Sequence, residues 1–180
     1  MEINFRANLI NNTSVMKRGV LSNRYLPSEA SFVKLDLRST EDIKTLKKLR
    51  KLWSKSFLSQ IYHDATMHPN KFNIYALTTQ MDKFEKLNPK NILGLAEATE
   101  DYNSATIEYL QTHPKYAYEE SNTNRAFVGI GTSLLNTLKG IERFKDIKLI
   151  SIFSAIDFYA KNGFDVTNDL QETLLVWKRD

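Results

Sequence analysis

The segment Arg125–Leu135, which reads RAFVGIGTSLL, constrains this chain more than any other part of the sequence. It ends a polar loop and opens an apolar helix, and it places Gly129 and Gly131 at the helix start. Glycines there let the backbone approach a ligand without a Cβ in the way. The first N–H groups of a helix have no partner inside it and carry partial positive charge, so the segment suits a phosphate. The alternative is a tight loop-to-helix turn.

Two neighbouring segments favour the phosphate-binding interpretation over a simple turn. Upstream, Ile107–Pro114 is a strand-like run that ends at a proline, and downstream Lys148–Ile152 reads as a short buried strand. Phe153–Phe164 follows and contains the sequence AIDFYAKNGF. The order is therefore strand, glycine loop, helix, strand and helix. Over residues 92–166 this arrangement resembles the GCN5-related N-acetyltransferase (GNAT) superfamily, in which an Arg/Gln-x-x-Gly-x-Gly/Ala loop binds the pyrophosphate of acyl-CoA.

The resemblance implies an α/β (α+β) fold: a mixed, twisted, mostly antiparallel sheet with helices on both faces. It also implies that two central parallel strands, 105–112 and 147–152, splay apart. The implied activity is that of an acyl-CoA-dependent N-acyltransferase, which moves acetyl from acetyl-CoA to a primary amine by direct attack. Acetyl-CoA is then the donor co-substrate, and no metal is expected.

The same resemblance implies a set of cofactor-binding residues. Backbone groups on the first splayed strand would face the thioester, the N–H groups of the glycine loop would hold the pyrophosphate, and Arg125 would add charge-assisted contacts. The residues expected to bind the cofactor are Leu110, Gln111, Thr112, Arg125, Val128, Gly129, Ile130, Gly131, Thr132 and Ser133.

Two positions depart from the family pattern. Ala126 stands where the family has Arg or Gln, with Arg125 one position earlier, and Ile152 stands where an Asn is often found. These departures motivate an alternative function, a catalytically weak or inactive GNAT-like module that binds CoA or a partner.

Tyr159 matches the family's tyrosine and is the candidate proton donor to the leaving thiolate. The alternative is an aromatic residue that anchors its helix. Glu97, in the otherwise apolar run Leu95–Ala98, is the candidate general base, and Glu108 is its competitor. Either carboxylate could relay the amine proton through water, or could be an ordinary outward strand residue.

The loop Lys115–Asn124 is a candidate contact for the acceptor. Its two tyrosines and two acids, Tyr116, Tyr118, Glu119 and Glu120, would suit a cationic amine, and a plain surface insertion is the alternative. The acceptor class stays open among small amines, antibiotics, peptide amines and aminoacyl-tRNA, because a fold does not select a substrate.

The remaining pattern predicts one GNAT-like domain over 30–180, preceded by residues 1–29 as an extension or a first strand. Alternation predicts a strand over 31–37, and Ser39 is expected to cap a helix whose apolar spacing continues to Ile61. The other expected strands are 73–79, 92–99, 105–112, 148–152 and 172–177, and the other expected helices are 131–139 and 154–162.

The helix that starts after Ser39 has a basic face, formed by Lys44, Lys47, Lys48, Arg50, Lys51 and Lys55. A solvated face is the favoured interpretation, and a contact with nucleic acid or an acidic partner is the alternative. His63, Asp64 and His68 cluster at the expected helix end, where a favourable helix C-terminus is preferred over an incomplete metal site.

Composition limits the function classes. The chain has no cysteine, which excludes disulfides, thiol nucleophiles and zinc–thiolate sites. Its net charge of +4 suits an anionic cofactor and does not by itself indicate nucleic acid. We expect acetyl-CoA and an amine as partners, no nucleic acid unless the acceptor is an aminoacyl-tRNA, no membrane, a homodimer as an option, and a cytoplasmic location.

Overall fold

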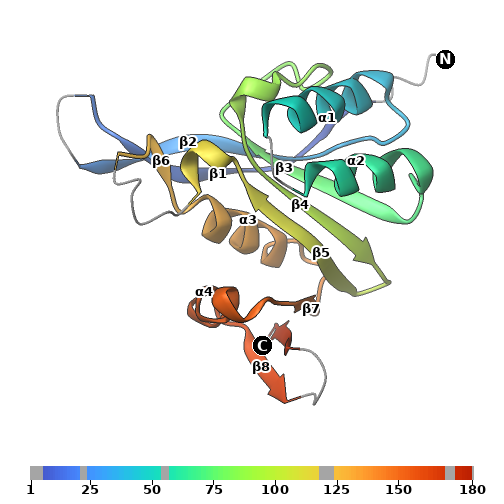
Figure 1. Ribbon diagram of the computed structural model, residues 1–180, viewed down its shortest axis with the longest axis vertical. Coiled ribbons are helices and arrows are strands. Elements are labelled where there is room, and N and C mark those ends of the chain that lie inside the picture. The colour runs from blue at the N-terminus through green and yellow to red at the C-terminus, as the bar shows by residue number, and fades with distance from the viewer. Residues whose placement is uncertain (1–5, 21–23, 54–56, 118–123, 169–172, 180) are drawn as a thin grey trace.

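The computed structural model describes residues 6–20, 24–53, 57–117, 124–168 and 173–179. Within these ranges the strands form one sheet in the order β6-β1-β2-β3-β4-β5-β7-β9-β8 (Figure 1). The strands are β1 (Asn8–Arg18), β2 (Tyr25–Lys34), β3 (Phe72–Thr78), β4 (Ile92–Glu100), β5 (Ser104–Thr112), β6 (Phe127–Val128), β7 (Asp146–Ile150), β8 (Asp165–Asn168) and β9 (Thr173–Lys178). The helices are α1 (Thr40–Leu52), α2 (Leu58–Met67), α3 (Ile130–Lys139) and α4 (Ile156–Lys161), with 3-10 turns η1 (Pro89–Asn91), η2 (Pro114–Tyr116) and η3 (Phe153–Ala155).

The neighbouring strands in these ranges pair antiparallel, apart from the parallel pair β5–β7. The expected mixed, mostly antiparallel sheet with one central parallel pair is therefore confirmed.

Helices cover both faces of the sheet, also as expected. Successive strand residues point to opposite faces, so Phe32 packs in the core beneath α3 while Val33 packs in the core beneath α1 and α2. Likewise, Tyr75 packs in the core beneath α3, and Ile74 packs in the core beneath α1 and α2. Figure 1 shows α1 and α2 on one side of the central strands and α3 on the other.

The region before residue 30 contains most of a strand pair. β1 and β2 run antiparallel from Asn8↔Lys34 to Arg18↔Tyr25, so Asn8–Arg18 and the start of β2 at Tyr25 belong to the sheet. The strand expected over 31–37 ends at Lys34 because the chain turns there. Ser39 N–H donates to Asp36 O at 2.8 Å, and Asp36 N–H donates to Asp42 Oδ2 at 2.9 Å.

The helix expected to run from Ser39 to Ile61 is two helices. The predicted cap is confirmed, since Ser39 Oγ accepts a hydrogen bond from Asp42 N–H at 3.4 Å. However, α1 ends at Leu52, and Trp53 leaves the helical conformation with φ −104° and ψ 65°. The change of direction lets both helices bury apolar side chains in one core, which contains Leu46, Leu49, Trp53, Leu58 and Ile61.

The remaining strand and helix predictions agree with the structure to within a few residues, and the helix expected at 154–162 starts with the 3-10 turn η3. Two short strands, β6 and β8, escaped prediction; β6 is stabilised by pairing with β1, which is distant in sequence, and β8 pairs with β9, the next strand along the chain. In the described ranges, no helix combines the length and apolar character needed to span a membrane.

Candidate active site

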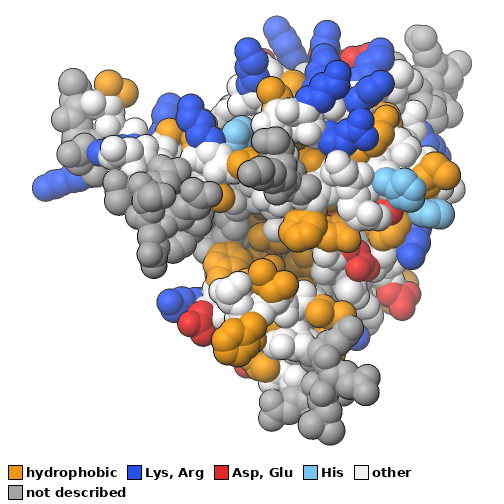
Figure 2. Space-filling model, in the orientation of Figure 1, with side chains coloured by type: hydrophobic (Ala, Val, Ile, Leu, Met, Phe, Trp, Pro, Cys, Tyr) orange, Lys and Arg blue, Asp and Glu red, His pale blue; other side chains and the backbone are white. Residues whose placement is uncertain are grey.

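β5 and β7 separate halfway along β5. Their parallel pairing runs from Ser104↔Asp146 to Ile107↔Leu149, and β5 then continues to Thr112 paired with β4 but not with β7. A cavity of about 510 Å³ opens beside this unpaired half. Figure 2 shows the hollow near the centre of the molecule with apolar side chains around it. Its lining residues are Phe57, Leu110, Gln111, Thr112, Tyr116, Ala117, Arg125, Gly129, Ile130, Gly131, Thr132, Ile152, Ala155, Phe158 and Tyr159.

The β4–β5 ladder determines which backbone groups of β5 face the gap. His113 N–H donates to Leu93 O at 2.8 Å, and Leu95 lies opposite Gln111. In an antiparallel pair, hydrogen-bonded residue pairs alternate with non-bonded ones, so Gln111 directs its backbone groups toward β4. Leu110 and Thr112 direct theirs to the other side, where β7 has moved away. Gln111 Nε2 donates to Thr112 O at 3.0 Å.

The N-terminus of α3 forms another wall of the cavity. Gly129 is its N-cap residue, in the left-handed conformation with φ 73° and ψ 12°, which glycine adopts without strain. The first intrahelical bond runs from Ser133 N–H to Gly129 O at 2.9 Å. The N–H groups of Ile130, Gly131 and Thr132 precede it and have no acceptor inside the helix. The helix therefore presents donors without an intrahelical acceptor at the cavity.

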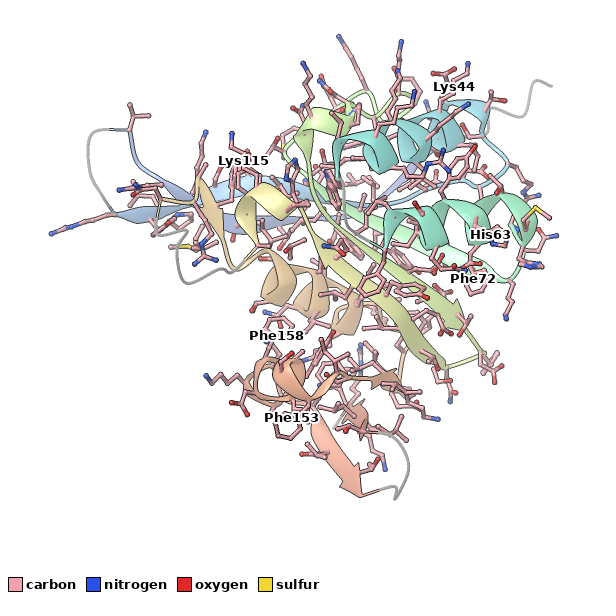
Figure 3. The ribbon with its side chains drawn as sticks, in the orientation of Figure 1. Lys44, His63, Phe72, Lys115, Phe153 and Phe158 are labelled. Carbon is pink, nitrogen blue, oxygen red and sulfur yellow. The ribbon has the colours of Figure 1, made fainter. Side chains whose placement is uncertain are left out.

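The two glycines serve different purposes. A Cβ on Gly129 would meet nothing within 4 Å. A Cβ on Gly131 would lie 2.9 Å from Phe158 Cζ, so this glycine lets α3 pack against the ring that α4 supplies. Phe158 lies between these two helices (Figure 3). The glycine pair thus combines a backbone requirement with a packing requirement.

Of the ten residues predicted to bind the cofactor, eight line this cavity: Leu110, Gln111, Thr112, Arg125, Gly129, Ile130, Gly131 and Thr132. Val128 and Ser133 line a neighbouring cavity of about 350 Å³, which shares Gly129 and Thr132 with the first. Val128 pairs with Met16 in the sheet, and Ser133 Oγ donates to Ser14 O at 2.9 Å.

Tyr159 lines the cavity from α4. Its ring meets Phe158 and Phe164 edge-on, with centroids 5.0 and 5.9 Å away. Burial raises the pKa of the Tyr159 hydroxyl above its usual value, which keeps the phenol protonated at neutral pH. The position supports both alternatives for this residue, since it is packed by aromatic neighbours and also faces the cavity.

Glu97 lies outside the cavity. Its side chain is fully buried on the α2 face of the sheet, and both carboxyl oxygens lack a hydrogen-bond partner among the described residues. Burial raises the pKa of Glu97 to about 8, with smaller contributions from the negative charges of Asp64 and Glu108. Tyr109, opposite Glu97 in the β4–β5 ladder, packs against Phe57 with 5.0 Å between ring centroids, and Phe57 lines the cavity.

Glu108 is absent from the cavity lining, and so is the cluster of His63, Asp64 and His68. Glu108 is exposed, and its Oε1 accepts a hydrogen bond from Thr99 Oγ1 at 3.0 Å. Asp64 accepts two hydrogen bonds from Gln60 Nε2 at 3.0 Å each, and His63 Nδ1 lies 3.3 Å from Asp64 Oδ1. Across the part of the chain that the structure describes, no group of three or more His, Cys, Asp or Glu residues could hold a metal ion.

Sequence reasoning missed one part of the cavity wall and anticipated another. Phe57 carries no motif and reaches the site only because the helix breaks after Trp53. Tyr116 and Ala117 come from the loop proposed to contact the acceptor. Tyr118, Glu119 and Glu120 of that loop, and Lys55 of the basic face, lie outside the described residues. The long-loop signal was therefore sufficient to predict part of this wall.

The sequence matches no protein-family model and no curated protein sequence. Solved structures are similar in fold. The PaiA N-acetyltransferase of Thermoplasma acidophilum, solved with coenzyme A, aligns over 83% of this chain and 99% of its own, with a TM-score of 0.52 and 16% identity. A putative GNAT-family acetyltransferase of Desulfovibrio desulfuricans aligns over 83% and 98%, with a TM-score of 0.57 and 10% identity.

The ribosomal-protein-S18-alanine N-acetyltransferase of Escherichia coli aligns over 82% of this chain and 90% of its own, with a TM-score of 0.51 and 15% identity. Identities this low show the fold alone. Together with the parted β5–β7 pair and the glycine loop at the start of α3, they show that this chain has the fold of the GCN5-related N-acetyltransferases.

Proposed function

We propose that the chain is an acyl-CoA-dependent N-acyltransferase that transfers acetyl from acetyl-CoA to a primary amine by direct attack. The observation that carries the proposal is the parting of β5 from β7 after Ile107. It leaves the backbone groups of Leu110 and the N–H of Thr112 facing a cavity of about 510 Å³. Backbone donors and acceptors turned away from their strand partner require another partner.

The lining residues fit acyl-CoA. The free N–H groups of Ile130, Gly131 and Thr132 suit a pyrophosphate, and the Arg125 side chain adds positive charge beside them. Val128 and Ser133 belong to the proposal through the neighbouring cavity, which Gly129 and Thr132 join to the first. The Leu110 and Gln111 region of β5 suits the pantetheine arm and thioester.

Bound acetyl-CoA supplies an activated thioester carbonyl. A backbone N–H on the open side of β5, at Leu110 or Thr112, would donate to an oxygen that gains negative charge. Tyr159 is our proposed donor of a proton to the departing thiolate, because a phenol carries its proton at neutral pH and this one lines the cavity.

Glu97 is our proposed acceptor of the amine proton. With a pKa of about 8, it changes protonation state in the range where a base must both take and release a proton. Because Tyr109 and Phe57 separate it from the cavity, its action would be relayed through intervening groups. Glu108 is the competing carboxylate on β5.

A second candidate function is CoA binding without turnover. It is favoured by one specific observation: none of the described residues that line the cavity is Asp or Glu. Ile152, in the place of the family's asparagine, adds an apolar side chain to that wall.

Calorimetric titration with acetyl-CoA is the primary test, with dephospho-CoA and desulfo-CoA as controls. We expect micromolar binding that weakens when the cofactor loses its phosphate, followed by free-thiol release in the presence of a suitable amine. Binding without thiol release across an amine panel would favour the second candidate. The absence of binding would reject both.

A further inference from the structure

Exposed basic side chains gather on α1 and on the segment that leads into β4. They form a single surface, called here the basic patch, whose members are Lys44, Lys47, Lys48, Arg50, Lys51, Lys86 and Lys90. Figure 2 shows it as the dense blue area at the top of the molecule, and Figure 3 labels Lys44 on the outer side of α1.

Charge is strongly segregated into this patch. Residues 40–52 and 85–91 carry its seven cations against only Glu41, Asp42 and Glu85. The surplus of four positive charges equals the net charge of the whole chain, so the remaining sequence is balanced. Asp42 is also buried, with its pKa raised to about 6, chiefly by burial. A local field of this kind attracts a polyanion.

The patch is held in place by the fold. Leu46 and Leu49 on the opposite face of α1 are fully buried, which fixes the rotation of the helix. Thr45 Oγ1 donates to Leu87 O at 3.2 Å and ties the segment containing Lys86 and Lys90 to α1. Gln80 also braces this segment, since its Oε1 accepts from Asn88 N–H at 2.9 Å. The cations are therefore presented by a preformed surface.

Most of these cations have no acidic partner among the described residues. Lys44 pairs with Glu41 at 2.7 Å, and Arg50 lies over the Tyr62 ring at 4.8 Å. Within the described ranges no ion pair involves Lys47, Lys48 or Lys51. Lysines that are not neutralised internally can release counterions when they meet phosphates.

We propose that the basic patch binds the phosphate backbone of a nucleic acid without reading its sequence. Lysine is a hydrated point charge that suits phosphate contact rather than directional recognition. Membrane binding is disfavoured because the apolar face of α1 is already buried in the core, leaving little to insert into lipid. The amphipathic helix alone predicted a solvated face. Its union with Lys86 and Lys90 is a feature of the tertiary structure.

The test is fluorescence anisotropy with a 20-nucleotide single-stranded RNA and a 20-base-pair DNA duplex, over a series of salt concentrations. The test variant is Lys47→Gln/Lys48→Gln/Lys51→Gln. The matched control is Lys71→Gln/Lys145→Gln/Lys178→Gln, which removes the same charge from exposed lysines outside the basic patch.

We expect the patch variant to bind about tenfold more weakly or worse, and the slope of log K against log salt to fall by about two to three. The control should keep the wild-type slope. Circular dichroism checks that both variants fold, and Lys86→Gln/Lys90→Gln, which leaves α1 intact, provides a second patch variant. Equal losses in patch and control variants, no binding at low salt, or equally tight binding to polyglutamate would each overturn the proposal.

Discussion

β5 has a closed side and an open side, and the contrast between them explains the candidate site. On the closed side β4 pairs with it from Gly94↔Thr112 to Glu100↔Ala105. On the open side β7 pairs with it only as far as Ile107. Backbone polar groups on the closed side are satisfied inside the protein, whereas those on the open side require another partner. The candidate site thus lies where strand pairing stops, beside the open half of β5.

The two sides of β5 also differ in where their ionisable side chains, Glu97 and Tyr159, lie relative to the cavity. Glu97, beneath α2, is sealed in the core, while Tyr159 faces the cavity. Burial raises the pKa of both groups and favours the neutral form of each. A neutral phenol is a ready proton donor, whereas a neutral carboxyl must ionise before it can act as a base.

The largest expected effect is on stability and comes from Glu97, on the closed side of β5. The pKa of Glu97 is about 8 in the folded chain against an ordinary value of 4.5. A raised carboxyl pKa means that the folded chain binds the proton more tightly than the unfolded chain. The free energy of unfolding should therefore decrease as pH rises from about 4.5 to about 8, by up to several kcal/mol.

Glu97→Gln should remove the part of this decrease that Glu97 contributes, leaving the smaller part due to Asp42 below about pH 6, and should make the variant relatively more stable at alkaline pH, as measured by urea unfolding at several pH values. If Glu97 is also the base, the rise of kcat near pH 8 should disappear in the variant. A pH–rate profile identical to the wild type would remove Glu97 from the mechanism, and a parallel stability curve would contradict its buried state.

On the open side, Tyr159→Phe should lower kcat by about 100-fold, because it removes the proposed proton donor and keeps the ring. The packing against Phe158 and Phe164 should persist, so the Kd for acetyl-CoA should stay within about twofold. Thiol-release kinetics and calorimetry measure the two quantities. Unchanged turnover would leave Tyr159 as an anchor of α4 only.

Gly131→Ala should weaken acetyl-CoA binding by about tenfold, because the new Cβ would lie 2.9 Å from Phe158 Cζ and displace the ring or α3. The double variant Gly131→Ala/Phe158→Leu should recover part of the loss, since leucine has no atom where the ring edge lies. A single variant with wild-type affinity would show that the close approach of α3 and α4 does not shape the site.

Gly129→Ala should have the smallest effect. No atom lies within 4 Å of the new Cβ, but φ of 73° costs a residue with a side chain about 1 kcal/mol of stability. Gly129→Asn should be milder, because asparagine tolerates the left-handed region better. Chemical denaturation compares the stability of the wild type, Gly129→Ala and Gly129→Asn. If calorimetry showed that Gly129→Ala loses as much affinity for acetyl-CoA as Gly131→Ala, the division of roles between the two glycines would be refuted.

Local patterns in the sequence were sufficient for much of this fold and for most of the cavity. The cap at Ser39, the strand alternation and the glycine loop all act within a few residues, so they can be read along the chain. Eight of the ten predicted cofactor residues line one cavity, and all of these except Arg125 belong to two such local units, the end of β5 and the start of α3. Val128 and Ser133 face the neighbouring cavity because β6 pairs with β1, which is distant in sequence.

The sequence by itself determined the order of elements, the free donors at the start of α3 and the presence of Tyr159 in a GNAT-like segment. Only the tertiary structure decided that Glu97 is sealed beneath α2, that Gly131 makes room for Phe158, and that Lys86 joins the cations of α1. The physical reason is the separation along the chain between the residues that interact. Capping and periodicity depend on neighbours along the chain, whereas burial, close packing and the local field depend on segments that meet only after folding.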